Sequence, residues 1–462
     1  MTETSVSFKT LGLDSSLVQA LDALGYSKPT PIQAQAIPHL LEGKDLCGIA
    51  QTGTGKTAAF ALPSIHYLTA NPQARPQRGC RMLILSPTRE LASQIARACT
   101  DYTRNLRMSV NAVFGGVPIG RQMRMLDRGT DILVATPGRL LDLIDQRALV
   151  LKDVEIFVLD EADQMLDLGF IHALRRIDKL LPKNRQTLFF SATMPKTIQE
   201  LSSQFLSDPV TVSVAPQSST AERVEQFGVF VNQSEKQALL TITLKDTPGL
   251  DRALVFTRTK HGADRVVRHL EAAGLPAAAI HGNKSQPQRE RALNAFRNGR
   301  LKILVATDIA ARGIDVPGVS HVFNFELPNV AEQYVHRIGR TARAGRDGQA
   351  ISFIANDERS YLRSIERLTR VKLQILPLPE NFVMEKELLP HPAPMRPERD
   401  SRDSRGRGGP GRGRGGFGGG APKPGFNHAH SNKGGDDRGG SGERPRRPRR
   451  PMTKGVRAVG RS

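Results

Sequence analysis

The sequence lacks the features of a secreted or membrane-spanning protein. Its 462 residues include three cysteines, Cys47, Cys80 and Cys99, whose spacing matches no metal-ligand pattern. So few thiols favour reduced, buried cysteines over a disulfide framework. Residues 1–10 carry neither the basic nor the apolar region of a secretory signal, and no apolar run approaches the length that spans a bilayer. We therefore expect a soluble, cytoplasmic protein without a membrane partner.

Acidic residues are also in deficit, since 66 Lys and Arg face 45 Asp and Glu, a net charge of +21. A surplus of this size favours a polyanionic partner, nucleic acid before an acidic membrane. The alternative is that the charge only keeps the chain in solution. Residues 396–461 alone hold 18 basic and 6 acidic residues, a surplus of 12.

The same C-terminal stretch is rich in Arg, Gly and Pro and has too few apolar residues to fold. We expect residues 376–462 to form a disordered basic tail. Arginines with occasional aromatics, Phe417 and Phe426, suit the phosphates and bases of single strands. A solvating tail with no specific partner is the alternative.

Ahead of this tail, short β-branched and apolar runs alternate with longer segments of helical period, which predicts parallel sheets flanked by helices. Around residues 207–222 the composition changes to Ser, Pro, Gln and Thr, and the alternation then restarts. We predict a first α/β domain over residues 1–210, a linker over 211–222 and a second α/β domain over 223–375. The predicted strands are 45–49, 81–85, 131–135, 155–159 and 186–190, then 252–256, 277–280, 302–306, 321–325 and 349–354.

A glycine-rich segment between the first predicted strand and an apolar run resembles a phosphate-binding loop. Its backbone N–H groups would converge on phosphate oxygens, Lys56 would reach the outer phosphates, and Thr57 would ligate Mg²⁺. A Gly-rich turn with a chance Lys-Thr is the alternative. The predicted nucleotide-binding residues of this loop are Ala50, Gln51, Thr52, Gly53, Thr54, Gly55, Lys56 and Thr57.

Two further segments are expected to complete a nucleotide site. Asp160 and Glu161 follow a hydrophobic strand, so Asp160 would hold Mg²⁺ and Glu161 would orient or deprotonate the attacking water. The alternative is that these two carboxylates only stabilise a helix N-terminus, where adjacent acidic residues are also common. The amide of Gln33 matches the hydrogen-bonding edge of adenine, and Phe8 would stack on the purine.

The order of these segments resembles the DEAD-box RNA helicases over about residues 6–370, and among them most closely the bacterial RhlE type. The resemblance implies two tandem RecA-like domains and an RNA-stimulated hydrolysis of ATP with Mg²⁺, coupled to unwinding of short RNA duplexes or remodelling of RNA–protein complexes. Ribosome-assembly or RNA-decay proteins would be its protein partners. The motifs that carry it are Gln33, 50–57, 87–91, 136–139, 160–163 and 191–193, then 286–289, 306–315 and 336–343.

The resemblance also implies residue roles. Lys56, Glu161, Arg340 and Arg343 would be catalytic, the two arginines as fingers on the γ-phosphoryl group. Asp160, Gly313 and Asp315 would lie at the nucleotide. Ser191 and Thr193 would couple ATP state to RNA remodelling, with hydroxyls bonded to the carboxylates of 160–163. The implied RNA contacts are Thr88, Arg89, Gly115, Gly116, Thr136, Arg139 and Thr307.

Two other functions stay open at this point. In the first, the chain is an RNA-binding chaperone or scaffold whose tail dominates and whose ATPase is incidental. In the second, it is a DNA-translocating helicase with the same two-domain engine. Gln33 and its surrounding segment count against the second.

Overall fold

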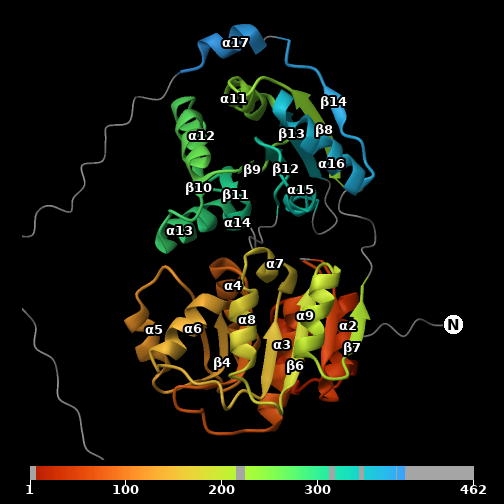
Figure 1. The fold of residues 1–462 in the computed structure, drawn as a ribbon, viewed down its shortest axis with the longest axis vertical. Coiled ribbons are helices and arrows are strands. Elements are labelled where there is room, and N and C mark those ends of the chain that lie inside the picture. The colour runs from red at the N-terminus through yellow and green to blue at the C-terminus, as the bar shows by residue number, and fades with distance from the viewer. Residues whose placement is uncertain are drawn as a thin grey trace, which may run out of the picture. The chain divides into compact units, whose positions relative to one another are not determined.

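The computed structural model describes residues 7–51, 53–214, 224–311, 318–342, 348–380 and 382–390. The described residues belong to one compact unit, and the basic tail from residue 391 on lies outside them. Within those ranges, the helices are all too short or too polar to cross a bilayer. Figure 1 shows the two α/β domains that the alternation of runs predicts.

The first domain is built on a sheet of seven parallel strands in the order β3-β4-β2-β5-β6-β1-β7. Its central strands are apolar throughout because helices cover both faces. In β1 a side chain at Gly48 would lie 2.5 Å from the Phe190 ring, so this register requires glycine. The strands are β1 Leu46–Ile49, β2 Cys80–Leu85, β3 Val110–Val113, β4 Thr130–Ala135, β5 Ile156–Leu159, β6 Gln186–Ser191 and β7 Val210–Ser213.

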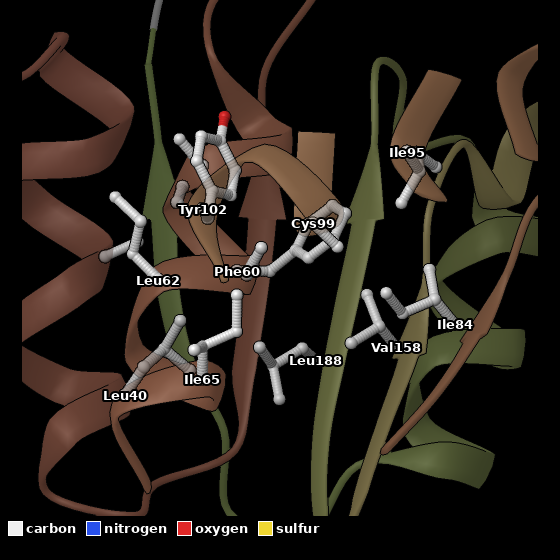
Figure 2. Close-up of a cluster of buried hydrophobic side chains, with 14 of the residues drawn as sticks. Leu40, Phe60, Leu62, Ile65, Ile84, Ile95, Cys99, Tyr102, Val158 and Leu188 are labelled. Atoms are coloured by element: carbon white, nitrogen blue, oxygen red, sulfur yellow. The ribbon is translucent and has the colours of Figure 1, made fainter. Parts of the chain in front are cut away.

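Alternate residues of each strand point into two separate cores. Ile84, Val158 and Leu188 pack against helices α2 to α4 on one face, where Figure 2 shows them in one cluster with Phe60 and Ile95. Leu83 and Leu159 pack against the later helices on the other face. The helical elements are η1 Phe8–Leu11, α1 Ser15–Ala23, α2 Pro31–Leu41, α3 Lys56–Ala70, α4 Arg89–Tyr102, α5 Ile119–Leu126, α6 Pro137–Asp145, α7 Ala162–Asp167, α8 Ile171–Asp178 and α9 Lys196–Phe205.

The second domain repeats this plan with a parallel sheet in the order β10-β11-β9-β12-β13-β8-β14. The strands are β8 Val224–Phe230, β9 Ala253–Thr257, β10 Ala277–Ile280, β11 Ile303–Thr307, β12 His321–Asn324, β13 Gly348–Ile354 and β14 Gln374–Leu376. The helices are α11 Lys236–Asp246, α12 Lys260–Ala272, α13 Gln286–Arg297, α14 Asp308–Ala311, α15 Ala331–Ile338, η2 Asn356–Glu358, α16 Arg359–Thr369 and α17 Phe382–Leu388.

Two predicted boundaries differ from the structure. Residues 211–213, assigned to the linker, continue β7, which pairs with β1. Strand β14 and helix α17 extend the second domain past residue 375 into the predicted disordered tail, because β14 pairs with β8 and Phe382 is buried in the second domain's core. The edge strands β7 and β14 are short, and their residues do not differ in kind from those of the adjoining loops.

The sequence analysis also missed strands β3 and β8. Strand β3 is half exposed at the sheet edge and contains Asn111, so its apolar pattern is weak. In β8, Glu225, Gln226 and Gly228 interrupt the apolar residues. Side chains at Gly228 would contact Ile354 at 2.9 Å, so a neighbouring strand accounts for that glycine.

Candidate nucleotide and RNA sites

The predicted phosphate-binding loop lies between β1 and the first turn of α3. Gly53 and Gly55 adopt φ of +85° and +96°, conformations that side chains other than glycine rarely take. The Ala50 N–H donates to Ser191 O at 3.0 Å and so continues the sheet into the loop. Lys56, the first residue of α3, is 6% exposed, and its Nζ has no hydrogen-bond partner among the described residues. A buried ammonium without an acceptor suits an anion placed at this helix N-terminus.

Gln33 holds the loop from the side. Its Nε2 donates to Gly55 O at 3.0 Å, and its Oε1 accepts from the Thr30 N–H at 2.9 Å. A side chain at Gly55 would lie 2.4 Å from Nε2, so the close approach of Gln33 also requires this glycine. The amide retains one N–H and one oxygen lone pair, which is what the adenine prediction needs.

Phe8, expected to stack on a purine, lies in the first core. Its side chain is 4% exposed and meets the Tyr26 ring edge to face, with centroids 6.4 Å apart. The structure therefore shows Phe8 as a packing residue of η1, and its stacking role stays a prediction.

The paired carboxylates of the first domain follow β5. Asp160 is 2% exposed, and its Oδ1 has no hydrogen-bond partner among the described residues. Burial raises the pKa of Asp160 to about 7, and the Lys56 ammonium opposes this rise. An orphaned buried carboxylate oxygen beside the phosphate loop fits a hard cation such as Mg²⁺. Glu161, at φ +58°, is 2% exposed and directly precedes α7.

Asp163 joins α7 to the segment after β6. Its Oδ2 accepts from the N–H groups of Ala192 and Thr193 at 3.1 and 3.0 Å, and from Thr193 Oγ1 at 3.0 Å. The expected hydroxyl contact is therefore present for Thr193. For Ser191 it is wrong, because Ser191 Oγ donates to Thr193 O at 2.8 Å and so shapes the turn instead.

Four of the residues expected to contact RNA meet after strands β2, β3 and β4. The Arg89 guanidinium lies against the Gly115–Gly116 loop, where a side chain at Gly116 would be 1.9 Å from Nη1. Arg139 Nη1 donates to Val117 O at 3.1 Å and to Gln122 Oε1 at 2.7 Å. Arg139 thus holds this loop in place from α6. Sequence reasoning missed Gln122, which has no pattern of its own.

Two threonines complete this edge of the sheet. Thr88 directly precedes α4, and its hydroxyl accepts from the Leu91 N–H at 3.3 Å and so caps the helix. Thr136 directly precedes α6, and its N–H donates to Val113 O at 3.0 Å. Both are less than a tenth exposed. These contacts place both threonines at the carboxyl ends of strands, where ligands of open α/β sheets bind.

In the second domain the predicted residues lie at the ends of β11 and α15. Thr307 ends β11 and is half-buried. Arg340 is 6% exposed, and its Nε donates to His336 O at 3.3 Å. A small cavity lined by Asp308, Gln333, Arg337 and Arg340 lies here. Thr52, Gly313, Asp315 and Arg343 lie outside the described residues.

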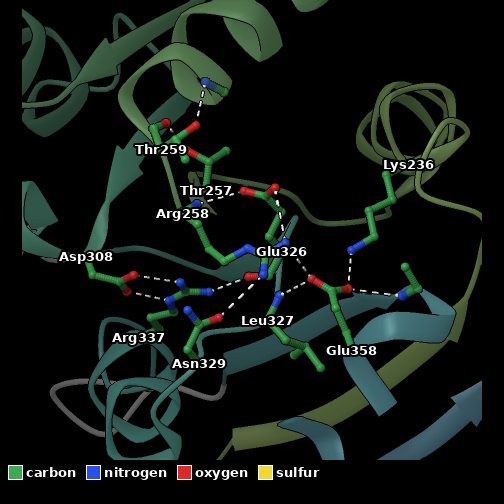
Figure 3. A network of polar contacts seen from close by, with 12 residues as sticks. Lys236, Thr257, Arg258, Thr259, Asp308, Glu326, Leu327, Asn329, Arg337 and Glu358 are labelled. Carbon is green, nitrogen blue, oxygen red and sulfur yellow. Dashed lines mark hydrogen bonds and ion pairs between the residues drawn. The ribbon is translucent and has the colours of Figure 1, made fainter. Parts of the chain in front are cut away.

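A polar network that the sequence analysis did not predict surrounds this point, as Figure 3 shows. The Arg337 guanidinium binds both oxygens of Asp308, at 2.5 and 2.7 Å, and donates to Glu326 O at 2.6 Å. This bidentate pair ties α15, the helix before Arg340, to the residue after Thr307. In the sequence, the one signal for a role of Arg337 was that it lies three residues before Arg340.

The network ends in a buried ion pair. Lys236 and Glu358 are both 0% exposed, and Lys236 Nζ donates to the Glu358 carboxylate. The same carboxylate accepts from the N–H groups of Leu327 and Ala355 at 3.1 and 3.0 Å, and Arg258 Nη2 lies 3.6 Å away. Burial lowers the pKa of Lys236, and Glu358 opposes this shift.

Comparison with known families assigns both domains. Residues 30–201 match the family described as DEAD/DEAH box helicase, and residues 236–345 match the helicase conserved C-terminal domain. The ATP-dependent RNA helicase CshA of Listeria monocytogenes is 45% identical over 372 residues, which cover 80% of this chain and 70% of that protein. The RNA helicase CrhR of Synechocystis is 46% identical over 388 residues, which cover 83% and 77%. These matches confirm the predicted DEAD-box helicase family, whereas the relatives named here are not of the narrower RhlE type.

Solved structures agree with the family matches. S. cerevisiae Dbp5 bound to RNA and ADP BeF3 is 30% identical, with a TM-score of 0.70 over 83% of this chain and 98% of that one. Mss116p bound to ssRNA and AMP-PNP is 27% identical, with a TM-score of 0.73 over 85% and 84%. Both agree with the tandem RecA-like fold.

Proposed function

Because the chain belongs to the DEAD-box ATP-dependent RNA helicases, we propose that it separates short RNA duplexes, or remodels RNA–protein complexes, by closing a divided ATP site. The observation that carries this is the pair of orphaned buried groups in the first domain, Lys56 Nζ and Asp160 Oδ1. They would receive ATP and Mg²⁺, while Arg340 belongs to the second domain. RNA and ATP together would favour the closed arrangement, because each would contact both domains.

Residues of this chain divide the work of hydrolysis. Lys56 would bind the outer phosphates, Asp160 and the Thr57 hydroxyl would hold Mg²⁺, and Glu161 would orient the attacking water. Arg340, and Arg343 with it, would stabilise charge that spreads over the γ-phosphoryl group. When bound, Mg²⁺ would neutralise part of the negative charge of the phosphates. Gln33 would select adenine through the N–H and lone pair that it retains.

RNA would bind at the loop that Arg89 and Arg139 support. Glycines at 115 and 116 let a sugar–phosphate backbone approach the main chain closely. Thr88, Thr136 and Thr307 would complete the contacts. A strand held in a bent path across both domains no longer fits an A-form duplex, so its partner strand is released.

Four narrower features belong to this proposal. Asp163 would relay the nucleotide state to the RNA side through Thr193. The RhlE type is supported by residues 281–286 and by the compact core with a basic tail. A cytoplasmic location is supported by three buried cysteines without a disulfide. Ribosome-assembly or RNA-decay proteins would be the partners of such an enzyme.

The test is ATP hydrolysis by the full chain with RNA, with DNA of the same sequence, and alone. We expect RNA to stimulate hydrolysis and DNA not to. Arg340→Lys should lower the RNA-stimulated rate about 10³-fold while ATP binding is kept. Arg363→Lys, at an exposed position of α16, is the matched control. Equal stimulation by DNA, or full hydrolysis by Arg340→Lys, would contradict the proposal.

Truncation near Pro390 separates the helicase from the scaffold alternative. A helicase keeps RNA-stimulated turnover without the tail, with weaker RNA binding, because both halves of the ATP site precede residue 390. A scaffold loses its activity with the tail. The salt dependence of RNA affinity should also become shallower, since the tail carries much of the basic surplus.

A further inference from the structure

A second basic site lies on the first domain, away from the loops described above. Arg78, Arg124 and Arg147 line a pocket of about 450 Å³ between α5, the end of α6 and the segment before β2. Arg78 precedes β2 and Asp127 precedes β4, so this pocket lies toward the amino ends of the strands. The nucleotide loop and the Gly115–Gly116 loop lie at their carboxyl ends. This pocket is therefore separate from both.

The backbone holds two of these arginines in unusual conformations. Arg78 and Arg147 have φ of +52° and +55°, a region that costs a residue with a Cβ about 1 kcal/mol. Hydrogen bonds fix both positions, from the Val150 N–H to Arg78 O at 2.8 Å and from the Arg147 N–H to Ile144 O at 2.9 Å. Glycine or asparagine would satisfy this backbone at lower cost. Arginine at both positions indicates that the side chains have a use in the pocket.

The pocket carries an uncompensated positive charge. Asp127 is the acidic residue of its lining, and it pairs with Arg78 at 3.3 Å. In the part of the chain that the structure describes, Arg124 and Arg147 form no ion pair, and both are exposed. Guanidinium groups bind phosphate oxygens in a bidentate manner. The lining thus presents two guanidinium groups to an anionic ligand.

Helix α5 connects this pocket to the loop expected to contact RNA. The helix begins three residues after Gly116 and is about 12 Å long. Arg121 and Arg124 are exposed and lie three residues apart on one side of α5, and the exposed Arg128 follows in the turn after the helix. A stripe of arginines therefore leads from the Gly115–Gly116 loop to the pocket.

We propose that the pocket binds backbone phosphates of the RNA strand after it leaves the Gly115–Gly116 loop and follows α5. The proposal rests on the proposed RNA contact at that loop. Continuity of the arginine stripe with the loop favours RNA over an acidic protein segment, which would not need this alignment. The pocket lengthens the RNA site of the first domain without reading base sequence, since phosphate contacts carry no sequence information.

The test compares short and long single-stranded RNA on the full chain. We would measure fluorescence anisotropy with uridine-rich strands of about 6 and about 20 nucleotides, in the presence of a non-hydrolysable ATP analogue. For Arg124→Glu/Arg147→Glu, the affinity for the long strand should fall about tenfold and the salt slope by about 1.4, the value for two phosphates. The affinity for the short strand should stay within about twofold, because that strand ends before the pocket.

Two further variants control for charge and for folding. Arg104→Glu/Arg107→Glu makes the same charge change at exposed positions outside the pocket, and it should show no length dependence. Arg124→Gln/Arg147→Gly removes the guanidinium groups while glycine relieves the left-handed backbone at 147, so it should fold and reproduce the loss on the long strand.

Equal weakening of both strands, or none, would overturn the proposal. Unchanged binding of both strands would leave the pocket to an acidic protein partner. Failure of the proposed function is seen separately, as a wild-type ATPase that the short strand does not stimulate.

Discussion

Replacing Lys236 by Met should destabilise the second domain strongly. The substitution keeps the volume of the side chain but leaves the Glu358 carboxylate buried without its ammonium partner. Removal of one member of a buried ion pair costs about 3–5 kcal/mol. Two backbone N–H groups and Arg258, 3.6 Å away, still face this carboxylate, so we expect the lower end, about 3 kcal/mol.

This loss should appear as a lower melting temperature of the second domain in calorimetry. At about 2–4 °C per kcal/mol for a domain of this size, the expected shift is about 6–12 °C. Lys245→Met, at an exposed position of the same helix, is the control and should change stability by less than about 0.5 kcal/mol.

A double-mutant cycle tests the physical cause. Glu358→Gln removes the charge that Lys236→Met leaves unpaired, so the double variant should cost about 1–3 kcal/mol less than the sum of the two single variants. Additive effects, or a loss below about 1 kcal/mol for Lys236→Met alone, would show that the pair does not act as a buried charge pair.

Three other predictions concern the first domain. Thr193→Val should abolish duplex unwinding while the RNA-stimulated ATPase rate stays within about threefold of wild type. Ser191→Ala should act more weakly, because only the Thr193 hydroxyl reaches the Asp163 carboxylate. Equal loss of ATPase and unwinding in coupled assays would contradict this. Asp160→Asn should stabilise the ligand-free protein. Burial raises the native pKa of Asp160 from 3.8 to about 7, so the wild type loses stability as pH rises from about 4 to 7, and the gain from Asn should grow by up to about 1.4 kcal/mol per pH unit over that range and level off above pH 7. A gain that is independent of pH between 4 and 7 would refute this. Gly116→Ala should weaken RNA binding and lower the unfolding free energy by about 1–2 kcal/mol, because φ is +80° and the Arg89 guanidinium occupies the space; Gly120→Ala, with open space in α5, should instead raise it by about 0.5–1 kcal/mol. Thermal melting would measure stability and anisotropy would measure RNA binding. Similar effects at the two positions would be evidence against this account.

The central strands and the phosphate loop could be predicted from local sequence. Strands β2, β4, β5 and β6 are buried on both faces, so their apolar runs are continuous and easily recognised. In the loop, glycines with positive φ and a Lys at the helix start follow from backbone chemistry alone. Both signals are local because each residue's environment follows from its near neighbours.

The edge strands and the division of roles within a motif depended on tertiary structure. Strands β3, β7 and β14 carry little apolar signal, and pairing with a distant strand alone identifies them. Ser191 and Thr193 have the same kind of hydroxyl two residues apart, yet only the fold decides which one faces Asp163.

The sequence by itself thus determined the two α/β domains, the glycine-rich loop before α3 and the basic character of the chain. The tertiary structure alone decided that Arg139 supports a loop, that Arg337 ties Asp308 to α15, and that Arg78 shares a pocket with Arg147. The physical reason is that a side chain interacts with the groups that lie near it in the folded chain. Residues such as Arg78 and Arg147, which are 69 positions apart, share no local sequence pattern that would predict their proximity.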